Sequence, residues 1–134
     1  MKTFVKNNDI YCVDKDDMSR IAKELGCKYY PLYDLSDFKN INLDIIILSV
    51  SIISFEDVLK NIDPQIFEGK LIVDVLSVKQ HAKSVMLKHL PKNCDIICSH
   101  PMFGPESGKN GWQGLTFLYE RVRVKDLNRA DRFL

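Results

Sequence analysis

Residues 44–50 read DIIILSV, and this stretch decides the fold. A continuous β-branched run of this length is typical of a strand that is buried on both faces in a parallel sheet. Residues 71–76 (LIVDVL) and 95–99 (DIICS) repeat the pattern farther along the chain. Because segments with helical spacing separate these runs, the sequence predicts alternating strands and helices, which is the form of a parallel α/β sheet.

Two helices are predicted between these strands. After Ser54, which together with Asp57 resembles a capping box, apolar residues follow at helical spacing: Phe55, Val58, Leu59 and Ile62. Residues 78–90 carry a second apolar stripe, formed by Val78, Ala82, Val85, Met86 and His89. We interpret His89 as a partly buried structural residue, and Lys79 in the first turn of this helix as a solvated one.

The two ends of the chain extend the alternation of strands and helices. Residues 10–13 and 28–30 are short β-rich runs, and the acids at 16–17 can cap a helix between them. Residues 117–124 (FLYERVRV) alternate apolar and polar side chains, which predicts a half-exposed strand near a sheet edge. A helical pattern begins at residue 125.

The composition is that of a globular protein, with 46% hydrophobic residues among 134 and a formal net charge of +1. This near-neutral balance argues against a partner such as nucleic acid or a membrane surface. No apolar run reaches the length of a membrane span, and the first residues lack the pattern of a signal or transit peptide. We therefore expect a cytoplasmic location, four reduced cysteines of which Cys94 and Cys98 are buried, and no metal site.

Right-handed crossovers place the carboxyl ends of parallel strands at one edge of a sheet, where such folds bind ligands. Asp14, Ser51, Ser77 and His100 follow the predicted strands and are expected at that edge. Two alternatives remain open for Asp14, which either accepts hydrogen bonds from a ribose or belongs to the helix cap. Ser77 likewise is an N-cap, a ligand contact or both.

Residues 99–112 read SHPMFGPESGKNGW, a loop rich in proline and glycine that contains the only tryptophan. His100 is the one good acid–base candidate, because an imidazole near its ordinary pKa can take a proton from a hydroxyl at neutral pH. Glu106 and Lys109 either recognise a charged substrate or pair with each other. The alternative interpretation is a surface turn with an incidental histidine.

Two familiar phosphate-binding motifs do not fit the sequence. The segment GPESGKN has one residue too few between its glycines for a P-loop and lacks Ser or Thr after the lysine. The dinucleotide fingerprint G-x-G-x-x-G occurs nowhere in the chain.

Two blocks resemble the prephenate/arogenate dehydrogenase family, particularly its plant-type arogenate dehydrogenase branch. They are DVLSVK at residues 74–79 and HPMFGPESGKNGW at residues 100–112. The resemblance implies a Rossmann-like doubly wound sheet. It also implies oxidation of arogenate or prephenate, with hydride transfer to NAD or NADP and loss of carbon dioxide, in tyrosine biosynthesis.

The resemblance also implies roles for individual residues. His100 would assist deprotonation of the ring hydroxyl, and Ser77 would help to hold that histidine and the substrate oxygen. The acid that matches Glu106 would lie at the mouth of the pocket, and Glu106 and Lys109 are expected to bind the substrate. Cofactor contacts are implied for three residues: Asp14, Ser51 and Ile52. The pair Asp14-Lys15 favours NAD over NADP, and the parent enzyme is expected to be a homodimer.

The chain departs from this family at both ends. The family's first strand and Gly-rich loop are missing before residue 8, and its C-terminal helical domain is missing after residue 134. We therefore expect residues 1–134 to be a partial NAD(P)-binding domain with an incomplete sheet. The alternatives are a non-catalytic remnant and a domain completed by a partner chain. A plastid location would require a transit peptide before Met1.

We predict that the purified 134-residue chain forms no measurable NADH or NADPH with arogenate or prephenate. The expected cause is that two parts of the family's site are missing: the phosphate-binding loop and the arginine that binds the substrate carboxylate. Absorbance at 340 nm measures the reaction, and robust turnover by the chain alone would contradict the prediction.

Overall fold

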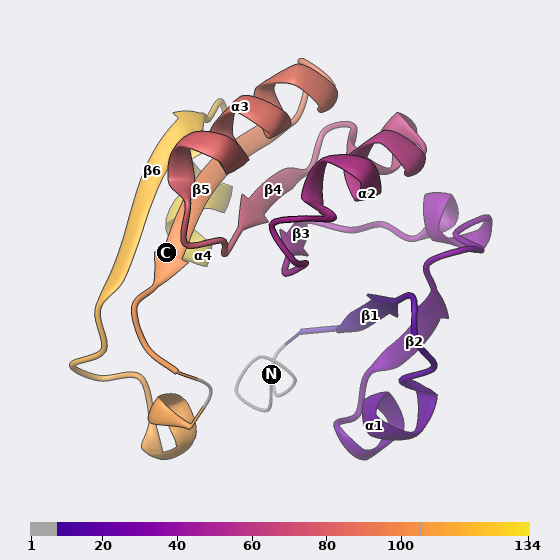
Figure 1. Cartoon of the computed structure of the whole chain (residues 1–134), viewed down its shortest axis with the longest axis horizontal. Helices are drawn as coiled ribbons and strands as arrows, with labels where there is room; N and C mark the ends of the chain where they lie inside the picture. The colour runs from indigo at the N-terminus through magenta and orange to yellow at the C-terminus, as the bar shows by residue number, and fades with distance from the viewer. Residues whose placement is uncertain (1–7, 105) are drawn as a thin grey trace. The chain divides into compact units, whose positions relative to one another are not determined.

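The computed structural model describes residues 8–104 and 106–134 (Figure 1). The chain divides into two compact units, Met1–Asn42 and Leu43–Leu134. Each unit has its own parallel strand pairing, and within the described residues the two sheets share no strand. The predicted class, an α/β fold with parallel strands, is confirmed.

The first unit contains a two-stranded parallel sheet and short helices. Strand β1 (Tyr11–Asp14) pairs with strand β2 (Lys28–Pro31) in parallel. Helix α1 (Ser19–Glu24) connects them, and the 3-10 helix η1 (Asp37–Asn40) follows. This order agrees with the short strands and the intervening helix that the sequence predicts.

The predicted cap of helix α1 by Asp16 or Asp17 is not formed, because the N-cap position belongs to Met18, but Asp17 bonds to the first residue of the helix. The Asp17 carboxylate accepts a hydrogen bond from the Ser19 backbone N–H at 2.9 Å. Hydrogen bonds from the Ser19 side chain first, and then from its backbone N–H, lower the pKa of Asp17. Gly26, with φ of +73°, lies just beyond the end of the helix in the left-handed conformation that glycine adopts without strain. On the apolar stripe, Ala22 is buried but Ile21 remains 48% exposed.

The second unit contains a four-stranded sheet in the order β3-β4-β5-β6. The first three strands are parallel, and β6 runs antiparallel to β5. In Figure 1, helices α2 and α3 lie on one face of this sheet and α4 on the other. The elements are β3 (Ile45–Leu48), α2 (Phe55–Asn61), η2 (Pro64–Phe67), β4 (Leu71–Asp74), α3 (Lys79–His89), β5 (Asp95–Pro101), η3 (Ser107–Asn110), β6 (Phe117–Arg123) and α4 (Leu127–Phe133).

Each face of the four-stranded sheet has its own hydrophobic cluster. The larger cluster lies under α2 and α3 and includes the fully buried Phe55, Ile72 and Met86. The smaller one lies under α4: Leu71, Val73, Ile97 and Ala130. Strand β4 is buried along its whole length, as its unbroken apolar sequence predicts.

Strand β3 differs from the prediction for residues 44–50, which expected burial on both faces. Only Leu48 is buried, and Ile47 is 47% exposed. The reason is position, because β3 forms an edge of this sheet. The α4 cluster covers the neighbouring Leu71 and Val73 but does not include Ile47.

Strand β6 is the edge strand that its alternating sequence predicts, and among the described residues it is the one strand of its sheet that runs antiparallel to the others. No long helix separates β5 from β6, and two strands joined by a loop without a crossover pair antiparallel. Strand β5 continues to Pro101, beyond the predicted end at residue 99. His100 therefore lies within the ladder, opposite Leu118 of β6.

Two further predicted helix caps are not formed. Ser54 precedes α2 with helical backbone angles, and its hydroxyl donates to the Ser51 carbonyl instead of capping the helix. An N-cap side chain normally needs an extended backbone, so the proposed box with Asp57 cannot close. At α3 the N-cap position belongs to Val78, which is 51% exposed, and not to Ser77.

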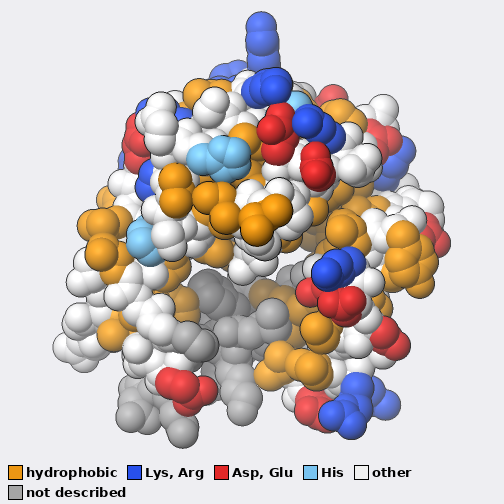
Figure 2. Space-filling view, in the orientation of Figure 1, with side chains coloured by type: hydrophobic (Ala, Val, Ile, Leu, Met, Phe, Trp, Pro, Cys, Tyr) orange, Lys and Arg blue, Asp and Glu red, His pale blue; other side chains and the backbone are white. Residues whose placement is uncertain are grey.

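Helices α2 and α3 are joined by a charge cluster around Glu56. Figure 2 shows acidic and basic side chains close together on this face of the molecule. The carboxylate of Glu56 lies 2.8 Å from His89 Nε2, 3.0 Å from Lys88 Nζ and 3.3 Å from Lys60 Nζ. Hydrogen bonds from His89 first, and then from the two lysines, lower the pKa of Glu56 to about 2. The structural role predicted for His89 is confirmed.

We predict that Glu56→Gln reduces the loss of stability in acid. A carboxyl group with a lowered native pKa stabilises the fold above its ordinary value of 4.5, and this contribution is lost as the pH falls towards about 2. Urea unfolding at several pH values in this window should show a shallower pH dependence for the variant than for the wild type. Asp57→Asn, on the same helix, is the matched control, and equal slopes for wild type and Glu56→Gln would refute the prediction.

Candidate active site

The carboxyl ends of β4 and β5 are joined through a buried acid, Asp74. Its side chain is fully buried, and its Oδ2 accepts a hydrogen bond from the Leu76 backbone N–H at 3.0 Å. The Ser99 hydroxyl donates to the Asp74 carbonyl oxygen at 2.6 Å. These bonds connect the last residue of β4 to the residue that precedes His100.

Lys79 completes this junction from the first turn of α3. Its Nζ donates to Asp74 Oδ2 and to the Ser99 carbonyl oxygen. The side chain is 29% exposed. The prediction of a solvated Lys79 is therefore wrong, because a buried carboxylate in an apolar strand requires a cationic or hydrogen-bonding partner.

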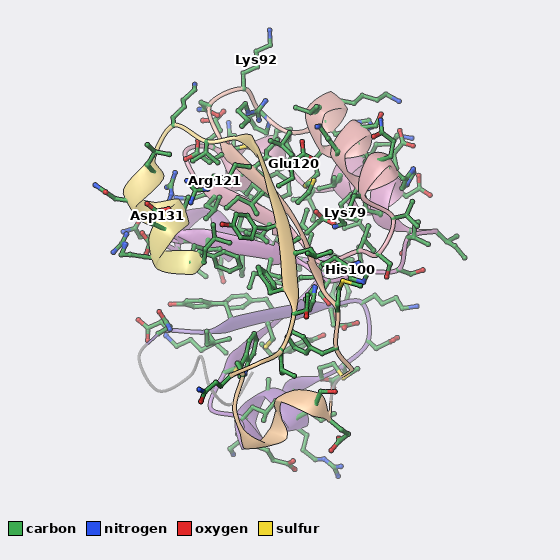
Figure 3. All side chains as sticks on the ribbon, turned by 90° about the vertical axis from the view of Figure 1, so that its left-hand side faces the viewer. Lys79, Lys92, His100, Glu120, Arg121 and Asp131 are labelled. Carbon is green, nitrogen blue, oxygen red and sulfur yellow. The ribbon has the colours of Figure 1, made fainter. Side chains whose placement is uncertain are left out.

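His100 follows Ser99 on β5 and is partly exposed. In Figure 3, Lys92 marks the end of the sheet where β5 begins, and Lys79 and His100 lie towards the opposite end. Among the residues that the structure describes, no hydrogen bond or ion pair engages the imidazole. The ring is thus available to a ligand at the carboxyl edge of the sheet.

Ser77 lies in the connection between β4 and α3 and is exposed. Its strand pairs directly with that of His100, since Asp74 lies opposite Cys98 in the parallel ladder. The structure thus brings Ser77 and His100 to neighbouring strand ends of one sheet. Because Ser77 makes no cap bond to α3, the ligand-facing alternative for its hydroxyl remains.

The loop after His100 is held at its base and folded on an aromatic pair. The Met102 N–H donates to the Thr116 carbonyl oxygen at 3.0 Å, which closes the loop. Phe103 and Trp112 pack edge to face with ring centroids 5.5 Å apart. A Cβ at Gly108 would lie 3.6 Å from the Trp112 ring, which is an ordinary van der Waals contact, so the packing does not by itself require glycine there.

The two predicted substrate contacts lie in this loop. Glu106 is exposed and directly precedes η3. The side chain of Lys109 lies outside the described residues. The suggested pairing of Glu106 with Lys109 therefore stays a prediction.

Asp14 ends β1 in the first unit, where a carboxyl-terminal acid was predicted. Its Oδ1 accepts a hydrogen bond from the Asp16 backbone N–H at 3.1 Å. Asp14 also lines a pocket of about 140 Å³, together with apolar side chains that include Met18 and Ile21. Its carboxylate therefore belongs to the turn before α1, and because the surface of the pocket is apolar, the ribose contact stays a prediction.

The other two predicted cofactor contacts follow β3 in the second unit. Ser51 is exposed, and its hydroxyl oxygen accepts a hydrogen bond from the Ile53 N–H at 3.3 Å. Ile52 is 39% exposed. Both residues therefore lie at the carboxyl end of a parallel strand, as the rim argument predicts.

The cysteines of the second unit are inert. Cys94 and Cys98 are fully buried, as predicted. Burial and the neighbouring Asp74 raise the pKa of Cys98 to about 12, so its thiol stays protonated at neutral pH. Within the described part of the chain, no group of His, Cys, Asp and Glu side chains is arranged to hold a metal ion. None of the helices in that part is long and apolar enough to cross a membrane.

Parallel strands, helices on both faces and polar residues at the carboxyl edge define a Rossmann-like α/β fold. The family model for the nucleotide-binding domain of prephenate dehydrogenase matches residues 1–124. The chain therefore belongs to the prephenate dehydrogenase family, as its sequence motifs predict.

Similar proteins support this assignment. Arogenate dehydrogenase 2, chloroplastic, from Arabidopsis thaliana is 39% identical over 139 residues, a match covering 99% of this chain and 38% of the relative. Arogenate dehydrogenase 1, chloroplastic, from the same plant is 39% identical over 132 residues, covering 93% of this chain and 20% of the relative. The chain thus spans well under half the length of these relatives.

A crystal structure shares the fold. Prephenate dehydrogenase from Aquifex aeolicus, solved in complex with hydroxyphenyl propionate and NAD+, matches with a TM-score of 0.68 and 17% identity. The match covers 98% of this chain and 50% of that one.

Sequence reasoning missed the roles of Asp74 and Lys79. A signal was present, because Asp74 interrupts an otherwise apolar strand and Lys79 begins the next helix. A charged residue in a buried strand needs a partner nearby in space. The sequence alone did not show that this partner would also reach β5.

Proposed function

We propose that this chain is the nucleotide-binding part of an NAD(P)-dependent dehydrogenase that oxidises arogenate or prephenate. The observation that carries the proposal is His100, an imidazole without a described hydrogen bond at the carboxyl edge of the sheet. The identity of 39% to two plant arogenate dehydrogenases favours arogenate as the substrate and a plastid as the location. The parent enzyme is proposed to be a homodimer.

Three of the chain's residues are proposed to hold the dinucleotide. Asp14 Oδ1 receives one backbone hydrogen bond, and among the described residues Oδ2 receives none, so Oδ2 can accept from a ribose hydroxyl. Ser51 and Ile52 are exposed at the end of β3, where the cofactor approaches the sheet in this class of fold. When bound, the nicotinamide ring supplies the hydride acceptor.

The chain's own chemistry is proton transfer by His100. An imidazole nitrogen accepts the proton of the ring hydroxyl, and the O–H electron pair forms the carbonyl as the carbon that bears this hydroxyl loses its hydrogen as hydride. Departure of the ring carboxylate as carbon dioxide then leaves the aromatic product. The exposed hydroxyl of Ser77, on the neighbouring strand end, is proposed to orient the same oxygen. Glu106 and Lys109 are proposed to contact the substrate from the loop.

A chimera can test this function in a protein of full length. Residues 1–124, which the family model matches, replace the aligned stretch of Arabidopsis arogenate dehydrogenase 2. A folded chimera that reduces NAD+ or NADP+ only when arogenate or prephenate is added supports the proposal. A chimera that unfolds cooperatively like its parent but lacks turnover contradicts it.

In this chimera, His100→Ala is expected to lower kcat by roughly 10²–10⁴-fold, the usual contribution of a positioned acid–base group. Steady-state kinetics with saturating cofactor measure the effect. His89→Ala, at the far end of α3, is the matched control and should leave kcat close to that of the parent. A near-normal kcat for His100→Ala would remove His100 from the proposed role.

NAD is the proposed cofactor, because the Asp14 carboxylate repels the 2′-phosphate of NADP. Asp14→Ser should raise the ratio of kcat/KM for NADP+ over NAD+ by about tenfold, which corresponds to about 1.4 kcal/mol. This free energy is smaller than the repulsion expected between two negative charges, those of Asp14 and the 2′-phosphate, at close range near a protein surface. Asp17→Ser is the control at a neighbouring acid, and an unchanged ratio in Asp14→Ser would argue against a ribose contact.

A further inference from the structure

The last peptide before His100 lies beyond the ladder that joins β4 to β5. The parallel pairing of these strands ends at Asp74 opposite Cys98. Ser99 therefore has no residue of β4 opposite it, although it is opposite Tyr119 on the β6 side. A strand end paired on only one side is less constrained than one paired on both sides.

Lys79 supplies the missing connection on the β4 side. Its ammonium group donates to the Ser99 carbonyl and to Asp74 Oδ2, and Asp74 is itself fixed by the Leu76 N–H. The Ser99 hydroxyl reaches back to the Asp74 carbonyl at 2.6 Å. Side-chain bonds thus continue the pairing of β4 with β5 for one residue past the backbone ladder.

This connection acts directly on His100 through the peptide plane. The Ser99 carbonyl and the His100 N–H belong to one planar unit, so a hydrogen bond that fixes the oxygen also fixes the start of the His100 backbone. Any hydrogen-bond donor could hold the Ser99 carbonyl, so this task alone does not require a lysine. Its charge, however, also balances Asp74, whose side chain is fully buried.

We propose that Lys79 is a positioning residue for His100. Lys79 holds the Ser99 carbonyl, and Asp74 balances the charge of the Lys79 ammonium group. The inference rests on the proposed function, since it concerns the geometry of the proposed acid–base group. A misplacement of about 1 Å in a reacting group can cost on the order of 10²-fold in rate. Loss of the Lys79 ammonium group should therefore affect kcat more than binding.

The kinetic test uses Lys79→Met, Lys79→Arg and the double variant Asp74→Asn/Lys79→Met in the chimera. Lys79→Met should lower kcat roughly 10- to 100-fold with little change in the KM for the cofactor. Lys79→Arg should recover most of the rate, because a guanidinium can bridge the carboxylate and the carbonyl. The single variant Lys79→Met leaves the Asp74 charge buried without a partner and can therefore fail to fold. The double variant removes this charge as well, so we expect it to fold. Its kcat should still be low, because the bond to the Ser99 carbonyl is lost.

Lys83→Met is the matched control. Lys83 lies one turn farther along α3 and forms an ion pair with Glu120 of β6 instead of reaching the strand ends. Its kcat should stay within twofold of the parent value. A normal kcat in the folded double variant, or an equal loss in Lys83→Met, would overturn the proposal.

A second measurement does not depend on catalysis. In the 134-residue chain, NMR should show faster amide hydrogen exchange and shifted ring signals for His100 in the double variant, but not in Lys83→Met. Unchanged His100 signals would overturn the positioning role even if the chimera is active. An inactive parent chimera with the expected His100 changes would instead refute the proposed function and leave the positioning of His100 supported.

Discussion

The ion pair between Asp74 and Lys79 is the interaction on which the candidate site depends. It neutralises a charge that would otherwise be buried alone in a strand that is buried along its whole length, and breaking such a pair by removing one partner typically costs about 3–5 kcal/mol. The same ammonium group reaches the Ser99 carbonyl. One interaction therefore unites the end of β4, the start of α3 and the strand that carries His100.

The sequence predicted most of the architecture because burial leaves clear patterns. The apolar run of β4, the stripes of α2 and α3 and the alternating β6 each became the expected element within one or two residues. The largest of these differences is at β4, which ends at Asp74 and not at Leu76. Where the predictions were wrong, the cause was the place of a segment in the folded sheet, which its own residues do not reveal. The composition of residues 44–50 resembles that of a central strand, yet β3 lies at an edge, and Ile47 is exposed because of its place in the sheet.

The candidate site was predicted in part. His100, Ser77 and Ser51 lie at strand ends as the crossover rule requires. The two family motifs that contain Ser77 and His100 were recognisable from their residues alone. Lys79 was wrongly predicted to be solvated, because a lysine in the first turn of a surface helix is usually exposed to solvent. Its real partners, Asp74 and the Ser99 carbonyl, are five and twenty residues away in the chain, so only the sheet pairing brings them within reach.

Strand β6, the antiparallel partner of β5, separates two tasks. The paired strands hold His100 in place, and the loop between them is left to recognise the ligand. Because β6 pairs with His100 and Pro101, and Met102 is bonded to Thr116, the anchored ladder ends where the loop begins. Changes of length or sequence between residues 103 and 115 are absorbed inside a closed hairpin and need not move the imidazole. Such a division lets evolution alter what the loop recognises while the proton-transfer group keeps its place.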